Sequence, residues 1–144
     1  MLWDVLRGTA HFSDARRAAL QAEGVVLEAD DAKGTLTYRD YRGPDRRASW
    51  RKEGLRVALA VTGRRVAADR RGGPLLDVPF DHPGVAGMTT GVDDGGKLVV
   101  AWDCALLRDD TTGRQELRVV LPGAERDRAV ALLLARGLGP FAAG

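Results

Sequence analysis

Residues 55–69, with the sequence LRVALAVTGRRVAAD, decide the fold class. In the first half of this stretch, every second residue is a large apolar one, and Arg or Ala stands between them. The apolar residues are Leu55, Val57, Leu59 and Val61. A period of two is typical of a strand that buries one face. Thr62-Gly63 is a tight-turn signal, and residues 64–69 have the pattern of a returning strand. The stretch therefore predicts a β-hairpin.

Strands are also predicted on the N-terminal side of this hairpin. Residues 25–29 form a short apolar run that ends at Asp30-Asp31. In residues 35–40, Leu36, Tyr38 and Asp40 fall on one face, and Thr, Tyr and Leu suit a half-buried pleated surface. Gly43-Pro44-Asp45 is turn chemistry, because proline fixes φ and glycine accepts unusual φ values.

Further short strands are predicted on the C-terminal side of the hairpin, at residues 75–80, 85–92, 97–102 and 115–121. The segments between them are rich in Gly and Asp, as at Asp93-Asp94-Gly95-Gly96. Pro79 either ends the ladder of its strand or marks a sheet edge. Consecutive hairpins without intervening helices favour an antiparallel arrangement.

Helical periodicity occurs only near the two ends. Ser13 is a predicted N-cap for a helix over residues 13–23, which Gly24 stops. Near the other end, Val130, Leu133 and Leu134 recur at helical spacing within residues 124–136. At the N-terminus, one helical turn is expected from apolar residues at helical spacing: Leu2, Val5 and Leu6.

The predicted class is mainly β with α. We expect seven antiparallel strands in a sandwich or partly open barrel, with a short N-terminal helix and a C-terminal helix that caps the barrel. The chain of 144 residues suits one domain over residues 24–137, with a helical segment at 1–23 and a flexible tail at 138–144.

Composition narrows the functional classes. The net charge of +2 lacks the basic excess of proteins that bind nucleic acid over their whole surface. Residues 129–138 are too short for a membrane span, and no secretory signal is recognised. Cys104, the single cysteine, permits no intrachain disulfide, which fits a cytoplasmic location. The excess of Arg over Lys, with abundant Ala and Gly, indicates a bacterial origin.

The pattern resembles that of the pleckstrin-homology-like (PH-like) fold, in particular its bacterial PH-like and GRAM-type members. The resemblance is carried by LRVALAVTGRRVAAD at 55–69, LLDVPF at 75–80, GGKLVV at 95–100 and the final helix. It covers residues 24–136 and implies seven antiparallel strands in two sheets with a C-terminal helical cap. Two family features are missing. The final helix has no tryptophan, and no two basic residues between 30 and 72 are two positions apart, so the family's lipid-binding residues do not carry over.

Charge is strongly polarised along the chain. Residues 39–71 contain eleven Arg and Lys against four Asp and Glu, a net charge of +7 that leaves −5 for the rest. The candidate binding residues lie in this segment: Arg42, Arg46, Arg47, Trp50, Arg51 and Lys52. Arginine forks match phosphate and carboxylate geometry. The alternative is a solvated hairpin whose arginines pair with acids elsewhere. For Trp50 alone, a packing anchor is preferred to a stacking platform.

Catalytic or metal-binding constellations are not recognised. His11 and His82 have no zinc-ligand spacing with Cys104, and no serine lies in a nucleophile motif. We expect Cys104 to be a buried structural thiol and His82 to occupy a turn. The prediction is therefore a noncatalytic protein without cofactor or metal.

Two binding functions remain open. The first is a protein-interaction or self-associating module that uses the basic segment and an exposed sheet edge. The alternative is an anion-binding module for an anionic membrane surface or a phosphorylated ligand, through the Arg-rich residues 39–56. Nucleic acid is not expected as a partner. An enzyme that uses His82 or Cys104 is a third, weaker hypothesis.

Overall fold

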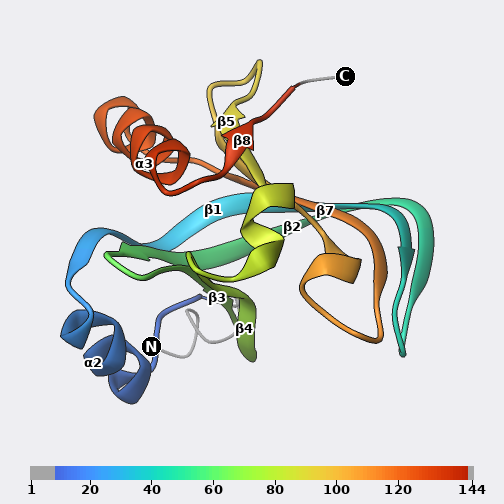
Figure 1. Ribbon diagram of the computed structural model, residues 1–144, viewed down its shortest axis with the longest axis horizontal. Helices are drawn as coiled ribbons and strands as arrows, with labels where there is room; N and C mark the ends of the chain where they lie inside the picture. The colour runs from blue at the N-terminus through green and yellow to red at the C-terminus, as the bar shows by residue number, and fades with distance from the viewer. Residues whose placement is uncertain (1–8, 143–144) are drawn as a thin grey trace.

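The computed structural model describes residues 9–142. Its strands form one sheet in the order β4-β3-β2-β1-β7-β6-β5-β8, curled into a half-barrel (Figure 1). In chain order the elements are α2 (Asp14–Ala22), β1 (Val25–Arg42), β2 (Arg47–Thr62), β3 (Arg65–Arg70), β4 (Gly73–Pro79), the 3-10 helix η1 (Pro83–Gly87), β5 (Thr89–Val92), β6 (Leu98–Asp103), the 3-10 helix η2 (Cys104–Leu106), β7 (Thr112–Val119), α3 (Gly123–Ala135) and β8 (Gly139–Pro140). The mainly β class is confirmed, with eight strands in place of the predicted seven.

β1 is one long strand, although two segments separated by Asp30-Asp31 were predicted. A bulge between Ala29 and Ala32 lets the strand continue, with Asp31 at a φ of 49°. Asp tolerates this left-handed conformation better than most residues do. The Asp31 carboxylate also accepts hydrogen bonds from Ala10 N at 3.0 Å and Arg56 Nε at 3.1 Å. Both contacts are long-range, so a local pattern does not reveal them.

The predicted turns on either side of β2 are confirmed. β1 and β2 form a hairpin in which Arg42 lies opposite Arg47, with the turn at Gly43-Pro44-Asp45. At the other end of β2, the Thr62 hydroxyl accepts hydrogen bonds from the amides of Arg64 and Arg65, both at 3.0 Å. These two turns set β1, β2 and β3 side by side.

β1 pairs with β2 on one side and with β7 on the other. Gly34 lies where the backbones of β1 and β7 are close together. A Cβ atom there would lie 2.5 Å from the carbonyl oxygen of Arg118, so any side chain would push the two strands apart. This close pairing joins β1–β4 and β5–β7 into a single sheet.

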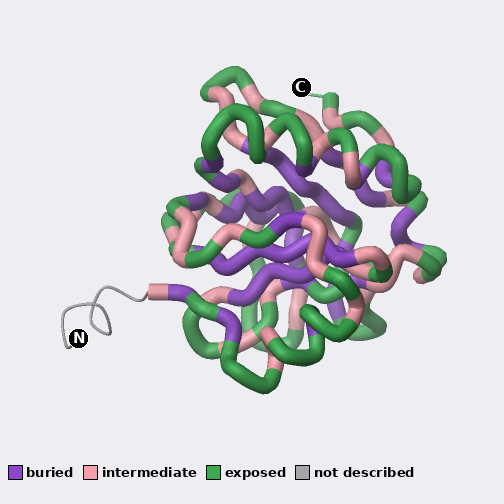
Figure 2. The backbone as a smooth tube through the Cα atoms, turned by 90° about the vertical axis from the view of Figure 1, so that its left-hand side faces the viewer, coloured by how far each residue is buried: buried purple, intermediate pink, exposed green. Residues whose placement is uncertain are grey.

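Both faces of β2 are buried over its last six residues, whereas one buried face was predicted. Val57, Leu59 and Val61 belong to the main core on the concave side of the half-barrel. Ala58 and Ala60 face a second cluster, which Phe12 and Leu20 complete with Ala67. The small alanine side chains allow α2 and the segment before it to pack closely on this outer face. The buried strands run through the middle of the molecule (Figure 2).

The two helices flank one end of the sheet on opposite sides (Figure 1). α2 begins as predicted, because the Ser13 hydroxyl accepts a hydrogen bond from Arg16 N at 3.2 Å. α3 contributes Ala129 and Leu133 to the main core. Leu134, which was predicted to lie on the apolar stripe, is 41% exposed. Of the predicted stripe, Leu133 is buried and Val130 packs against the core, so the prediction is wrong only for Leu134.

Two segments near the C-terminal half differ from expectation. Residues 83–87 form η1 in place of the start of a strand, because His82 Nδ1 accepts a hydrogen bond from Gly84 N at 2.9 Å and caps the helix. Residues 138–140, the first part of the predicted flexible tail, lie against the sheet: Leu138 is buried, and β8 pairs in parallel with β5. A two-residue strand that contains proline has no periodicity to detect.

The helical turn predicted from Leu2, Val5 and Leu6 lies outside the described residues. Within the described range, neither helix is long and apolar enough to span a bilayer.

Candidate anion-binding pocket at the hairpin end

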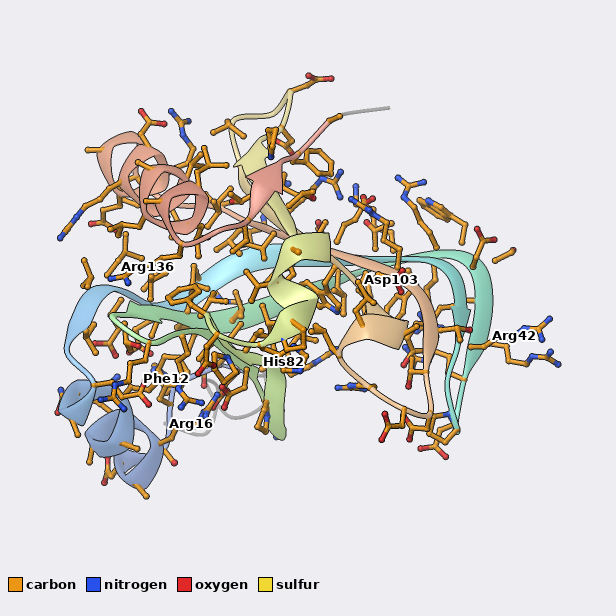
Figure 3. All side chains as sticks on the ribbon, in the orientation of Figure 1. Phe12, Arg16, Arg42, His82, Asp103 and Arg136 are labelled. Carbon is orange, nitrogen blue, oxygen red and sulfur yellow. The ribbon has the colours of Figure 1, made fainter. Side chains whose placement is uncertain are left out.

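The six predicted binding residues lie on the distal half of the β1–β2 hairpin, but its two faces separate them. Arg51 lies opposite Tyr38, whose side chain is in the core, whereas Trp50 and Lys52 lie on the other face, opposite Arg39 and Thr37. Arg42 and Arg47 are paired next to the turn. Figure 3 shows Arg42 at the far end of the hairpin, pointing away from the rest of the molecule.

Glu53 is the centre of a cluster on the concave face. Its carboxylate accepts hydrogen bonds at 2.8 Å from both Arg70 Nη1 and the Tyr38 hydroxyl. Arg51 Nη2 and Arg46 Nη1 lie further away, at 3.7 and 3.9 Å from Glu53 Oε2. Three guanidinium groups thus share one carboxylate, whose side chain is 18% exposed. The cluster carries more positive than negative charge.

The protonation states in this cluster are fixed by its geometry. Burial opposes ionisation of Glu53, but hydrogen bonds from Arg70 and Tyr38 outweigh it and lower the pKa of the carboxyl. Burial, together with the neighbouring Glu53, raises the pKa of the Tyr38 phenol. At neutral pH Glu53 is therefore a carboxylate, and Tyr38 keeps the proton that it donates.

A pocket of about 390 Å³ opens beside this cluster. Three separate parts of the chain line it: the hairpin turn, which includes Arg46; the end of β3, with Arg70; and the loop after η2, with Arg108. Tyr38 and Tyr41 form an apolar wall, with their rings edge to face and the centroids 5.0 Å apart. The pocket therefore combines cationic donors with a rigid aromatic surface.

Several arginine N–H groups in and beside this pocket have no hydrogen-bond acceptor among the described residues. The 3.7 and 3.9 Å separations of Arg51 and Arg46 from Glu53 are too long for hydrogen bonds. Among residues 9–142, Arg46 Nη1 has one hydrogen-bond acceptor, the Tyr38 hydroxyl at 3.2 Å, and its guanidinium lies 5.4 Å from the centre of that ring. Arg108 makes no ion pair with another residue in the described range. Since each guanidinium has five N–H groups, most of their donors are available to a ligand.

The opposite face of the hairpin carries a second cluster around Glu116 of β7. Arg39, Arg114 and Arg118 contact its buried carboxylate at 3.0, 3.3 and 3.0 Å. Trp50, opposite Arg39 on this face, is 58% exposed. The preference for Trp50 as a packing anchor is therefore wrong. The reason is that no helix or strand of the described chain covers this part of the outer face.

Sequence reasoning found Arg46 and Arg51 but missed their surroundings. Tyr38 was assigned only to a buried face, and Arg70 and Arg108 are distant in sequence from the hairpin turn. Nothing in a local pattern brings these residues together. The alternative of a solvated, ion-paired hairpin is also partly correct: six of the eleven cations in residues 39–71 pair with described acids, namely Arg39, Arg46, Arg51, Arg56, Arg65 and Arg70.

The weaker catalytic candidates are placed apart. His82 occupies a turn as predicted and caps η1. Cys104 is 1% exposed, and burial raises the pKa of its thiol to about 11. A cavity of about 190 Å³ lies beside Cys104, and His82 is not among the residues that line it.

A scan against protein-family models finds no match for this chain, and a search of curated proteins finds none either.

Proposed function

We propose that the protein is a noncatalytic PH-like binding module that binds a phosphate-bearing anion in the pocket beside Glu53. The observation that carries the proposal is the charge of this pocket: three arginines line it, Arg46, Arg70 and Arg108, against two acids, Asp45 and Glu53. A phosphate group offers acceptor oxygens that match guanidinium forks. Arg46 from the hairpin turn and Arg108 from the loop after η2 are the residues that would hold it.

Glu53 has a supporting role in this proposal. It holds Arg70 and Tyr38 in place at 2.8 Å, and these contacts orient the floor of the pocket. It also supplies a carboxylate that competes with an incoming anion for the same cations. A binding site of this kind is preorganised but incompletely neutralised, and the attraction of a further anion follows from Coulomb's law.

The PH-like assignment rests on the order of elements. Consecutive antiparallel hairpins run from β1 to β4 and from β5 to β7, and a C-terminal helix packs on the main core. The pocket lies among loops at one end of this sheet, where connecting segments commonly carry function.

Calorimetric titration at low ionic strength tests the proposal, with inorganic pyrophosphate as the soluble probe and phosphatidic acid vesicles as the membrane probe. The variant Arg46→Met with Arg108→Met is expected to weaken binding at least tenfold, because two charge-assisted contacts are lost. Arg128→Met, on the exposed surface of α3, is the matched control and should bind as the unaltered protein does. Binding to vesicles alone would assign a lipid headgroup as the source of the phosphate.

Glu53→Gln provides the sharper experiment. Removing the competing charge while keeping the shape should strengthen pyrophosphate binding several-fold, because Arg46, Arg51 and Arg70 are then without a carboxylate. The proposal fails if pyrophosphate and vesicles both leave the protein unbound at low salt, or if the control loses as much affinity as the double variant.

A further inference from the structure

β2 has an open edge along more than half of its length. It pairs with β1 from Arg47 to Thr62, but with β3 only from Ala58 to Val61. β3 ends at Arg70, and Gly72 and Gly73 turn the chain away with φ values of 94° and 144°. Among the described residues, no strand pairs with residues 47–57 on this side. An edge of this kind presents backbone N–H and C=O groups that lack a neighbouring strand.

The edge is long enough to take a strand. Typical strands have five or six residues, and the open segment of residues 47–57 exceeds that length. A segment added here would lie in line with β3, on the same side of β2. Alternate backbone N–H and C=O groups of β2 point toward that position. Each of them needs a hydrogen-bond partner, which an added strand would supply.

A groove of about 620 Å³ lies where β3 ends and the open edge begins. Lys33, Arg56, Arg70 and Arg71 supply all of its charged lining, without an acidic residue. Gly54 also lines it, and a Cβ atom built there would meet nothing within 4 Å, so the groove is open to an incoming chain at this point. Arg56 is paired with Asp31 and Arg70 with Glu53, whereas Lys33 and Arg71 make no ion pair with another described residue. The groove is therefore sterically accessible and has two cations without an acidic partner in the described range.

The charged side chains on the open segment of β2 are also mostly basic. Arg47, Arg51, Lys52 and Arg56 lie on the open segment, with Glu53 as the one acid. Arg47 and Lys52 make no ion pair with another described residue, and Glu53 is already hydrogen-bonded to Arg70. Opposite charges on neighbouring strands stabilise their pairing, and like charges destabilise it. An acidic strand is thus complementary to this edge, whereas a second copy of β2 would place basic residues against basic residues.

We propose that residues 47–57 of β2 bind an acidic segment of a partner protein as an added β-strand. Backbone hydrogen bonds would provide the pairing, and acidic side chains on the two faces of the added strand would meet Arg47 on one face and Lys52 on the other. Trp50, 58% exposed on the outer face, would contact an apolar side chain of the added strand. The surface adjoins the Glu53 pocket and shares Glu53 and Arg70 with it. The proposal does not rest on phosphate binding, because it is drawn from the uncovered backbone edge of β2.

A fluorescein-labelled ten-residue peptide with the repeat Glu-Glu-Thr, which places Glu on both faces of a strand, is the probe, and fluorescence anisotropy gives its affinity. N-methylation of alternate residues leaves one edge of the peptide able to donate hydrogen bonds, and N-methylation of every residue leaves neither. All three peptides carry the same charge. We expect the alternately methylated peptide to bind within threefold of the parent and the fully methylated one to bind at least tenfold more weakly. Equal binding of all three would overturn the proposal, because attraction by charge alone would explain it.

Protein variants locate the site. Arg47→Glu with Lys52→Glu should weaken peptide binding at least tenfold, whereas Arg128→Glu on α3 should leave it unchanged. Hydrogen exchange of the unaltered protein should slow within residues 47–57 when the peptide is added. Protection elsewhere but not there would contradict the proposal. Light scattering examines the competing occupant: a dimer that excess peptide fails to dissociate would show that a second copy covers the edge.

Discussion

Two groups of guanidinium–carboxylate contacts, at opposite ends of the molecule, differ in their balance of charge. Beside α2, Arg16 contacts Asp69 at 2.9 Å and Asp77 at 2.7 Å, and Arg65 contacts Asp77 and Glu23, both at 2.8 Å. Two arginines are thus shared among three acids. At the hairpin end the ratio is reversed, with three arginines around Glu53 and three more around Glu116.

The difference in charge balance indicates that the contacts beside α2 hold the fold together, whereas those at the hairpin leave cations for solvent or a ligand. The contacts beside α2 join three elements, because Arg16 belongs to α2, Asp69 to β3 and Asp77 to β4. Arg16 also lies 5.8 Å from the centre of the Phe12 ring, and both residues sit beside α2 in Figure 3. In the group beside α2, every named arginine and acid is paired with an oppositely charged side chain. At the hairpin, cations exceed acids on both faces, and the surplus is directed to solvent or to a ligand.

The largest expected effect is on folding stability, from Arg16→Met. This substitution keeps much of the apolar stem but leaves Asp69, with a side chain 10% exposed, without its guanidinium partner. Removing one member of a largely buried ion pair is costly, so the free energy of unfolding should fall by about 2–3 kcal/mol. Urea denaturation measures it. Arg17→Met is the matched control on the same helix, and its more exposed contact with Glu28 should cost less than about 1 kcal/mol.

The next largest effect is expected on the pH dependence of the free energy of unfolding. Burial opposes ionisation of Asp77, but hydrogen bonds from Arg16 and Arg65 prevail and lower its pKa; a hydrogen bond from Arg65 lowers the pKa of Glu23. A carboxyl whose pKa is lower in the folded state stabilises the fold above its ordinary pKa, and that contribution is lost as the pH falls through the folded-state value. The free energy of unfolding should therefore decrease below about pH 5.

Asp77→Asn separates this contribution from the rest. Its stability should be lower than that of the unaltered protein at pH 7, and the further loss between pH 6 and pH 3 should be smaller, because one titrating carboxylate is gone. Denaturation at a series of pH values gives both quantities. An unchanged acid response would mean that the contacts beside α2 do not control it.

The smallest effect is expected from Arg51→Met at the hairpin. Arg51 is half exposed and 3.7 Å from Glu53, and contacts of this kind contribute about 0–1 kcal/mol. The free energy of unfolding should change by less than about 1 kcal/mol in the same urea assay. If Arg51→Met destabilises the protein as much as Arg16→Met, the hairpin cluster is a structural network like the one beside α2, and the proposed pocket loses its basis.

Local patterns were sufficient for elements whose signal is carried by neighbouring residues. The Ser13 cap, the turns at Gly43-Pro44-Asp45 and Thr62-Gly63, and the returning strand β3 are all as predicted. The bulge at Asp31 was missed because its carboxylate depends on Ala10 and Arg56, which are distant in sequence. The exposure of Trp50 was missed for a related reason: burial depends on what covers a side chain, which its own strand does not specify.

By itself the sequence determined the alternation of apolar and polar residues, the main turns, the two helices and the concentration of positive charge in residues 39–71. These properties arise from residues a few positions apart, where backbone geometry alone sets the neighbours. Only the tertiary structure decided that Arg46, Arg70 and Arg108 line one pocket and that β3 leaves half of β2 uncovered. Curling of the sheet and the length of strand pairing bring these residues together, and both are set by packing across the whole chain.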